Sequence, residues 1–179
     1  VFFTFNSLNN IYSLSWRNHP NAPKMIALLS EIMRYMLYDC GTKRVKLQKE
    51  VRLIENYIAL QNLSQEENMN IDFYHEGIDN KQEIAPMLLI NFVENAFKHS
   101  QILEISEAWI SIELTVDENV LYFNVENSRA NSVNLTKNSG IGNQNTLRQL
   151  ELNYPNRHEI ELEDREKVFH AHLKIELEN

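Results

Sequence analysis

Asn91-Phe92-Val93-Glu94-Asn95-Ala96-Phe97-Lys98-His99 is the stretch that decides the fold, because its periodicity predicts a helix with one apolar and one polar side. At about 100° per residue, the five polar side chains of this stretch fall within an arc of about 140°. Two carboxamides one turn apart can face a single ligand, and a buried carboxamide without a partner costs about 1–3 kcal/mol. An ordinary amphipathic helix whose polar side faces water explains the same periodicity equally well.

A small glycine cluster further along the chain favours a ligand. Ser139-Gly140-Ile141-Gly142-Asn143-Gln144-Asn145 runs directly into a helical pattern of leucines. Glycines at the start of a helix let backbone N–H groups approach an anion, and the helix dipole favours negative charge there. Alone, such a cluster is more often a loop or a cap. Together with the asparagine-bearing helix, it predicts a phosphate-containing ligand.

The first third of the chain is predicted to be helical. Apolar spacing indicates a helix over residues 2–16, which His19-Pro20-Asn21-Ala22-Pro23 interrupts. A second helix over 23–38, which Asp39-Cys40-Gly41 ends, is apolar over more than half of its circumference. Such a helix must be covered on two sides, which predicts a homodimeric four-helix bundle. In the alternative interpretation, the globular part of the same chain covers the second side.

The rest of the chain mixes helices and strands. Beyond a helix over 47–63 and a polar turn at 65–68, alternation predicts strands, and Pro86 opens the asparagine-bearing helix. The loop 128–139 is long for a compact domain and is either a functional lid or an ordinary loop. The expected strands are 71–75, 108–116, 120–125, 158–162 and 168–177, with hairpin turns at 117–119 and between the last two, and a further helix ends near 152.

Composition narrows the class of protein. The formal net charge of −8 argues against a nucleic-acid-binding surface, and the single cysteine, Cys40, allows no internal disulfide and is expected to be a small buried hydrophobe. The sequence contains no apolar run of about 18 residues, so no membrane span is predicted. The chain starts without methionine in the middle of a motif, so we expect it to be the cytoplasmic end of a longer protein.

Several motifs, taken in order, resemble the ATP-binding domain of the GHKL superfamily, and within it the LytS-type sensor histidine kinases. Phe3-Thr4-Phe5-Asn6-Ser7-Leu8-Asn9 is similar to the end of the phosphoacceptor motif of that family. A second signature is matched by Val45-Lys46-Leu47-Gln48-Lys49-Glu50 with Tyr57-Ile58-Ala59-Leu60-Gln61. Ile84-Ala85-Pro86-Met87-Leu88-Leu89 then leads into Val93-Glu94-Asn95-Ala96-Phe97-Lys98-His99, which is similar to the N box. Val125-Glu126-Asn127-Ser128 takes the place of a first glycine box, and Gly140-Ile141-Gly142 with Asn145 that of a second.

The resemblance implies an α+β fold. A helical dimerisation hairpin over 1–67 would precede, over 68–179, a GHKL (Bergerat) two-layer α/β sandwich with a mixed, mainly antiparallel sheet and helices on one face. It also implies the kinase core of a two-component sensor, which transfers the γ-phosphate of ATP to a histidine and then to the receiver domain of a response regulator. The membrane would be reached only through segments outside this chain, in a bacterial inner-membrane protein whose cytoplasmic domain this is.

The resemblance also assigns roles to residues. Asn95 would bind Mg²⁺, with Asn91 facing the same phosphates or a metal-bound water. Lys98 would contact a phosphate oxygen, with His99 either helping it or capping the helix. Glu94 would either act as a base on the attacking group or pair with Lys98. Glu126 and Asn127 would hold the adenine side, and Gly140, Ile141, Gly142 and Asn145 the phosphate side.

Two departures from the family pattern bear on activity. Phe2 stands where the family has its phosphoacceptor histidine, and Val1 stands where proline is usual. Phenylalanine cannot accept a phosphoryl group, so autophosphorylation at this position is not expected. Glu126-Asn127-Ser128 replaces Asp-x-Gly, which predicts weaker or water-mediated contact with adenine. The alternatives are therefore a pseudokinase that binds ATP without labelling itself and, less favoured, a GHKL clamp ATPase.

Overall fold

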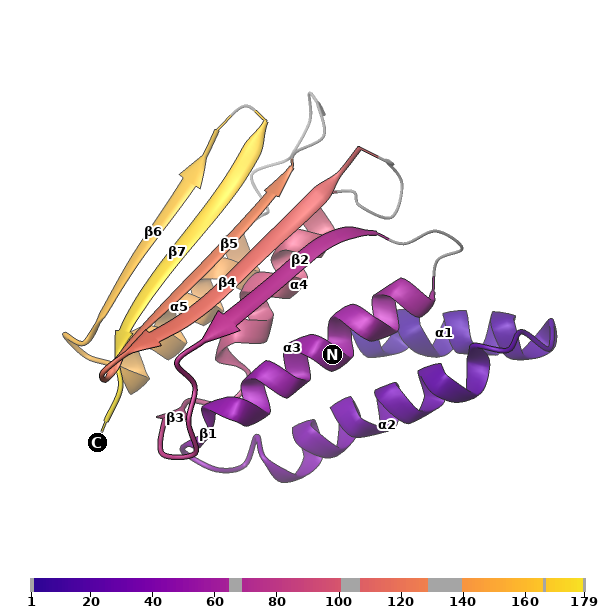
Figure 1. Cartoon of the computed structure of the whole chain (residues 1–179), viewed down its shortest axis with the longest axis horizontal. Helices are drawn as coiled ribbons and strands as arrows, with labels where there is room; N and C mark the ends of the chain where they lie inside the picture. The colour runs from indigo at the N-terminus through magenta and orange to yellow at the C-terminus, as the bar shows by residue number, and fades with distance from the viewer. Residues whose placement is uncertain (1, 65–68, 101–106, 129–139, 166, 179) are drawn as a thin grey trace.

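The computed structural model describes residues 2–64, 69–100, 107–128, 140–165 and 167–178, and the side chains of 2–6 and 140–143 are outside this description. The predicted turn at 65–68 and nearly all of the predicted lid loop also lie outside the described residues. Two parts are evident: a helical hairpin, and a twisted sheet with helices packed on one face (Figure 1).

The helical hairpin consists of α1 (Phe2–Trp16) and α2 (Ala22–Tyr38). The predicted break between them is confirmed: Asn18 has a φ of 52°, and Pro23 lies in the first turn of α2, where its missing N–H is not needed. The predicted end of α2 is confirmed as well, since Asp39 caps the helix. Cys40 packs against the core but is only half-buried, so it is less buried than expected.

The predicted apolar stripe of the third helix is confirmed. In α3 (Leu47–Leu63), one side is buried and packs against both α2 and α4 (Leu88–Ser100). Two short strands, β1 (Val45–Lys46) and β3 (Glu83–Ile84), pair just before α3 and α4 and hold the starts of these helices together. Contacts therefore cross the predicted domain boundary between residues 67 and 68.

The main sheet has five strands in the order β2-β4-β5-β7-β6. β2 (Asn70–Glu76) runs parallel to β4, and all other neighbours are antiparallel, which confirms a mixed, mainly antiparallel sheet. Both predicted hairpins are confirmed. They consist of β4 (Trp109–Asp117) with β5 (Val120–Ser128), and of β6 (His158–Asp164) with β7 (Val168–Glu176).

One glycine in the sheet is sterically required. Gly77, directly after β2, has a φ of 76°, and a Cβ atom there would lie 2.0 Å from the carbonyl oxygen of Val116. Glycine therefore lets the turn after β2 pass close to the backbone of β4.

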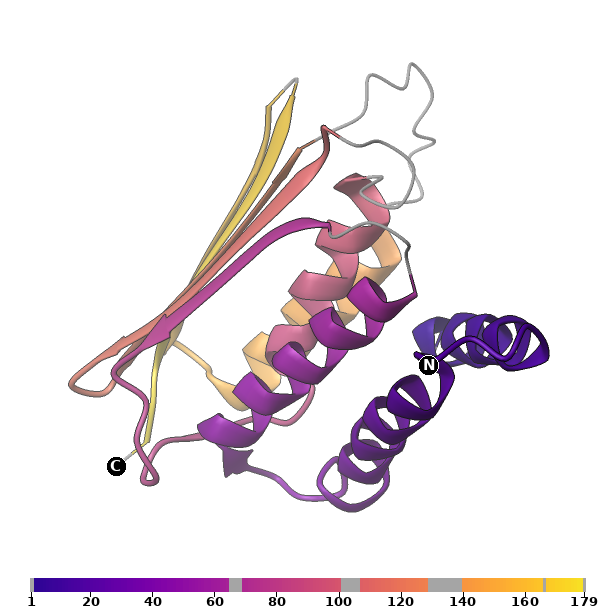
Figure 2. The ribbon, with the colours of Figure 1, turned by 45° about the vertical axis from the view of Figure 1, so that its right-hand side comes forward.

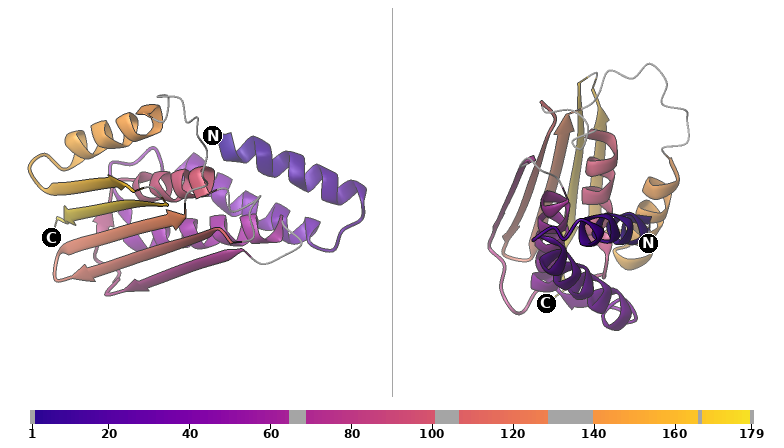
Figure 3. Two further views of the ribbon diagram at one scale, coloured as in Figure 1. Left: turned by 90° about the horizontal axis from the view of Figure 1, so that it is seen from above. Right: turned by 90° about the vertical axis from the view of Figure 1, so that its right-hand side faces the viewer.

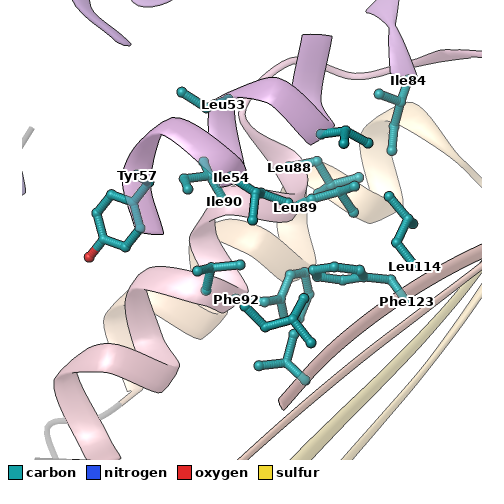
Figure 4. Packing of buried hydrophobic residues seen from close by; sticks show 14 of the residues in the cluster. Leu53, Ile54, Tyr57, Ile84, Leu88, Leu89, Ile90, Phe92, Leu114 and Phe123 are labelled. Carbon is teal, nitrogen blue, oxygen red and sulfur yellow. The ribbon is translucent and has the colours of Figure 1, made fainter. Parts of the chain in front are cut away.

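The core lies between one sheet face and the layer of α3, α4 and α5 (Gly140–Asn153) (Figure 2). Alternation along the strands directs every second side chain toward these helices, and the apolar sides of α3 and α4 meet them. Phe92 of α4 contacts Phe123 of β5 edge to face, with ring centroids 6.1 Å apart (Figure 4). None of the helices in the described part of the chain lies on the opposite sheet face (Figure 3). The predicted placement of helices on one face is confirmed.

The hairpin α1–α2 extends away from the sheet beside α3 (Figure 2). Only one side of α2 is buried, including Met25, Leu29 and Ile32. Its other side stays exposed at Ile26, Met33 and Leu37. The described residues of the globular part thus do not cover the second side of α2, in contrast to the alternative interpretation from sequence.

Candidate functional site

Helix α4 carries the predicted ligand residues on its less buried side. Asn91, Glu94, Asn95 and His99 are half-buried and Lys98 is exposed, whereas the apolar residues from Leu88 to Phe97 are buried. The two-sided character expected from the sequence is therefore present. The polar side is not an ordinary solvated surface either, because four of its five members are partly covered.

Glu94 faces the side of α4 that meets α3. The pKa of Tyr57, in α3, is raised by burial and by the nearby Glu94 carboxyl, and the Tyr57 ring lies edge-on to Phe97, with 5.0 Å between centroids. Oε1 of Glu94 is buried and has no hydrogen-bond partner among the described residues. Burial raises the pKa of this carboxyl.

Glu94 and Lys98 do not form the ion pair that was one interpretation of their spacing. No such contact joins these two side chains in the described part of the chain. A poorly solvated carboxyl with a raised pKa is instead suited to accept a proton or a hydrogen bond.

Asn127 lies near the end of β5, on the sheet face that looks toward α4. Its side chain is fully buried, between the register partners Ile110 and Phe169. Nδ2 donates a hydrogen bond to the carbonyl oxygen of Ser128 at 2.8 Å, but Oδ1 has no partner among the described residues. The C-terminal ends of β5 and α4 lie at the same end of the sheet (Figure 2). A buried acceptor that no described residue uses is thus present at the end of the sheet where the asparagine-bearing helix ends.

Glu126 is not brought to this site. Successive strand residues point to opposite faces, so Glu126 lies on the sheet face without helices, where its Oε1 is 3.8 Å from Nε2 of His170. Of the two residues predicted to hold the adenine side, only Asn127 points toward α4. The alternation of Leu121, Phe123 and Val125 with polar neighbours already carried this signal in the sequence.

The glycine cluster marks the beginning of α5, as expected, because this helix starts at Gly140. The side chain of Ile141 lies outside the described residues, and Asn145 is exposed. The far end of α5 is fixed to the segment before α4. Nε2 of Gln149 donates to the carbonyl oxygen of Pro86 at 3.0 Å, and the Ala85 N–H donates to the Tyr154 hydroxyl at 2.7 Å.

The N-terminal motif lies in α1, and Phe2 is the first residue of that helix. Its side chain lies outside the described residues, so its surroundings are not defined. Within the described residues, no group of three His, Cys, Asp or Glu side chains is arranged to hold a metal ion, and no helix is long and apolar enough to cross a bilayer. The predicted Mg²⁺ ligand, Asn95, is not one of these four residue types and would bind the ion through its amide oxygen.

One buried acid was missed by the sequence analysis. Glu50 of α3 has no exposed surface and accepts hydrogen bonds from groups of α2 and α4. It stands among the apolar residues Leu47, Val51 and Ile54, on the same side of α3. A charged residue inside an apolar stripe is the signal that could have revealed it.

Comparisons with known proteins agree with the motifs. A histidine kinase family model matches residues 2–69. An uncharacterized sensor-like histidine kinase of Staphylococcus epidermidis is 34% identical over 114 residues, which is 63% of this chain and 22% of that protein. The sensor protein kinase HptS of Staphylococcus aureus is 30% identical over 64% of this chain and 21% of its own length. The chain thus spans about a fifth of the length of these relatives.

Solved structures share the fold. A blue-light activated histidine kinase of Erythrobacter litoralis matches 98% of this chain and 57% of its own, with a TM-score of 0.56 and 14% identity. The catalytic domain of histidine kinase ThkA matches 74% of this chain and 95% of its own, with a TM-score of 0.51 and 19% identity. ThkA in complex with the response regulator protein TrrA matches 97% of this chain, with a TM-score of 0.50 and 17% identity.

Proposed function

Because this chain belongs to the sensor histidine kinases and has the fold of their catalytic domains, we propose that it is the ATP-binding kinase core of a two-component sensor. ATP would lie between α4 and the start of α5, with its adenine at the end of β5. The observation that carries this proposal is the buried Oδ1 of Asn127, which has no partner among the described residues, at the end of the sheet where α4 presents its half-buried amides. A buried acceptor without a partner costs about 1–3 kcal/mol, which a ligand N–H would recover.

Asn127 is the acceptor for the exocyclic amino group of adenine in this proposal. Its own Nδ2 is already engaged with the Ser128 carbonyl, and this bond orients Oδ1 as the remaining hydrogen-bonding group. An amide acceptor is neutral, so it needs no counter-charge in a buried position. Glu126, on the opposite sheet face, has no role in this contact.

The α4 amides would hold the phosphate end. Mg²⁺ takes about six oxygen ligands, so the carboxamide oxygen of Asn95, with Asn91 one turn earlier, fits its ligand chemistry. When bound, the ion would neutralise phosphate charge. Lys98 is exposed and can reach a phosphate oxygen, with His99 next to it. Backbone N–H groups from Gly140 to Gly142, at the N-terminus of α5, would complete the anion site.

Glu94 would orient the attacking group, and its raised pKa and unpaired Oε1 support a proton-accepting role. Phosphoryl transfer depends mainly on positioning, so an acceptor held in line is also needed. Phe2 occupies the place of that acceptor and has no nucleophilic atom. We therefore expect ATP binding without labelling of this position.

The exposed apolar side of the helical hairpin supports a homodimer. Leu8, Tyr12 and Trp16 are spaced four residues apart on α1 and are all exposed, as are Ile26, Met33 and Leu37 on α2. Two copies of the hairpin would bury these side chains in a four-helix bundle. The complex of ThkA with its response regulator supports a receiver domain as the other partner.

A pseudokinase is the second candidate, and Phe2 favours it. Incubation with radiolabelled ATP and Mg²⁺ separates the candidates. Acid-labile label on the protein indicates a kinase, binding without label a pseudokinase, and steady phosphate release a clamp ATPase. If Phe2→His acquires label, the rest of the machinery is competent.

The nucleotide site itself is tested by a matched pair of variants on adjacent residues of β5. Asn127→Leu removes the buried acceptor at similar volume, so we expect Mg-ATP affinity to fall about 5- to 150-fold while the fold is retained. Glu126→Gln, on the other face, should bind like the wild type. Calorimetric titration with Mg-ATP measures both. Equal affinity in the two variants would show that Asn127 does not bind the nucleotide. A wild-type chain that gives no heat of binding with Mg-ATP would contradict the proposed function.

A further inference from the structure

Glu50 is a fully buried acid that joins three helices. It belongs to α3, and its carboxyl accepts a hydrogen bond from the Tyr35 hydroxyl of α2. It also accepts hydrogen bonds from the backbone N–H groups of Met87 at 2.7 Å and Leu89 at 3.1 Å, where α4 begins. The same carboxyl is thus shared by the helical hairpin and by the helix that carries Asn91 and Asn95.

Glu50 contacts the N-terminal end of α4, where backbone N–H groups require hydrogen-bond acceptors from outside the helix. The first N–H groups of a helix have no partner within the helix, and negative charge is favourable there. Met87 precedes the first residue of α4 and has a φ of 60°. This backbone conformation is unfavourable for any residue other than glycine. Glu50 therefore accepts hydrogen bonds from the strained entry into α4, although it belongs to another helix.

All three partners donate to Glu50, which stabilises its ionised form. Burial acts in the opposite direction and raises the pKa of Glu50, while the bonds from Tyr35 and from the α4 backbone oppose that rise. Loss of one donor therefore leaves a buried acid less well compensated. The pKa of Tyr35 is raised as well, by burial and by Glu50, which keeps its hydroxyl protonated as the donor.

The other end of the contact lies on a helix that is packed on one side only. A half-open pocket of about 310 Å³ lies between α2 and α3 beside Tyr35, and most of its lining residues are charged or polar. Two of them, Lys49 and Asp39, form an ion pair at 2.6 Å. The outer side of α2 is exposed. A shift of α2 of about 1 Å would stretch the Tyr35 hydrogen bond beyond its useful length. The contact is therefore sensitive to the position of α2.

We propose that the Tyr35–Glu50 pair couples the position of α2 to the entry of α4, so that Glu50 is a positioning residue for the amides Asn91 and Asn95. This inference rests on the proposed nucleotide site. Coupling is reciprocal, so a nucleotide that fixes α4 must also stabilise α2 by the same factor. The C-terminal half of α2 should therefore respond to Mg-ATP, although it has no proposed contact with the nucleotide.

The test compares Tyr35→Phe with Tyr38→Phe, a tyrosine of the same helix that is exposed. Amide hydrogen exchange is measured with and without Mg-ATP. We expect Mg-ATP to slow exchange over residues 32–38 in the wild type and in Tyr38→Phe, and to leave it unchanged in Tyr35→Phe. A purely structural role of the hydroxyl would change the exchange rate but not its response to nucleotide.

Glu50→Gln probes the same link from the other side. A glutamine in this place must set its NH₂ against either the Met87 or the Leu89 N–H, so we expect weaker Mg-ATP binding, by tenfold or more. Glu55→Gln, on the exposed side of α3, is the matched control and should bind normally. If Glu50→Gln fails to fold, Tyr35→Phe still decides, because it keeps both backbone bonds to Glu50.

The outcomes separate the two proposals. Wild-type chain that does not bind Mg-ATP would overturn the nucleotide site and the coupling together. Wild-type chain that binds, with an unchanged α2 or with the same α2 response in Tyr35→Phe, would overturn the coupling alone. Additive effects of Tyr35→Phe and Glu50→Gln on Mg-ATP affinity in a double-mutant cycle would also contradict it.

Discussion

Helices α2 and α4 have similar apolar content but different surroundings. Every large apolar residue from Leu88 to Phe97 in α4 is buried by the sheet and by α3. In α2, Met25, Leu29 and Ile32 are buried, whereas Leu37 remains 73% exposed. The apolar residues of α4 are therefore buried within this chain, whereas α2 buries only one of its apolar sides. The outer side of α2 is thus available for another molecule.

The largest expected effect contrasts a leucine of each helix. Leu89→Ala should lower the free energy of unfolding by about 2–5 kcal/mol, because it leaves a cavity where the side chain is fully buried. Leu37→Ala removes an exposed side chain and should change it by less than about 0.5 kcal/mol in a monomer. Urea unfolding measures both. Similar losses at a concentration where the chain is monomeric would contradict the contrast.

The next effect concerns the exposed side of the hairpin. Trp16→Glu should weaken the proposed dimer about tenfold or more, because tryptophan is frequently a dominant residue in interfaces and a charge there would be desolvated. Trp16 is 80% exposed in this chain. Leu152→Glu, on an exposed position of α5, is the matched control. Light scattering over a concentration series measures the dimer constant, and equal constants for the two variants would place the dimer interface elsewhere.

The smallest effect is electrostatic and belongs to α4. Burial raises the pKa of Glu94 above its usual 4.5, so the folded protein holds this proton more tightly than the unfolded chain. The contribution of Glu94 to stability is therefore fully present below pH 4.5 and is lost as pH rises through the raised pKa. Glu94→Gln should lack this loss. Thermal unfolding of both proteins across this range measures it, and parallel pH profiles would contradict the assignment.

Much of the fold was predictable because its signals are local. The breaks around Pro20 and Pro23, the two hairpins, the stripe of α3 and the two-sided α4 all follow from side-chain period or from turn residues. The pairing of β1 with β3 and the parallel pairing of β2 with β4 were not predicted. Such pairings join segments far apart in sequence, and short strands carry little periodicity.

The candidate site was predictable in part for the same reason. The polar side of α4 was evident from its helical period, and α5 begins at the predicted glycine. The motif match pointed to Glu126 as well as Asn127, but strand alternation directs only Asn127 toward α4. Contact of Glu50 with Tyr35 and with the start of α4 required the structure, because it joins three helices.

The sequence by itself determined which segments are helices or strands, which side of each is apolar, and to which family the motifs belong, since these depend on near neighbours along the chain. Only the tertiary structure decided which polar groups remain without partners and which helices share one carboxyl. Hydrogen-bond satisfaction depends on atoms brought together from distant segments, and no spacing along the chain encodes those distances.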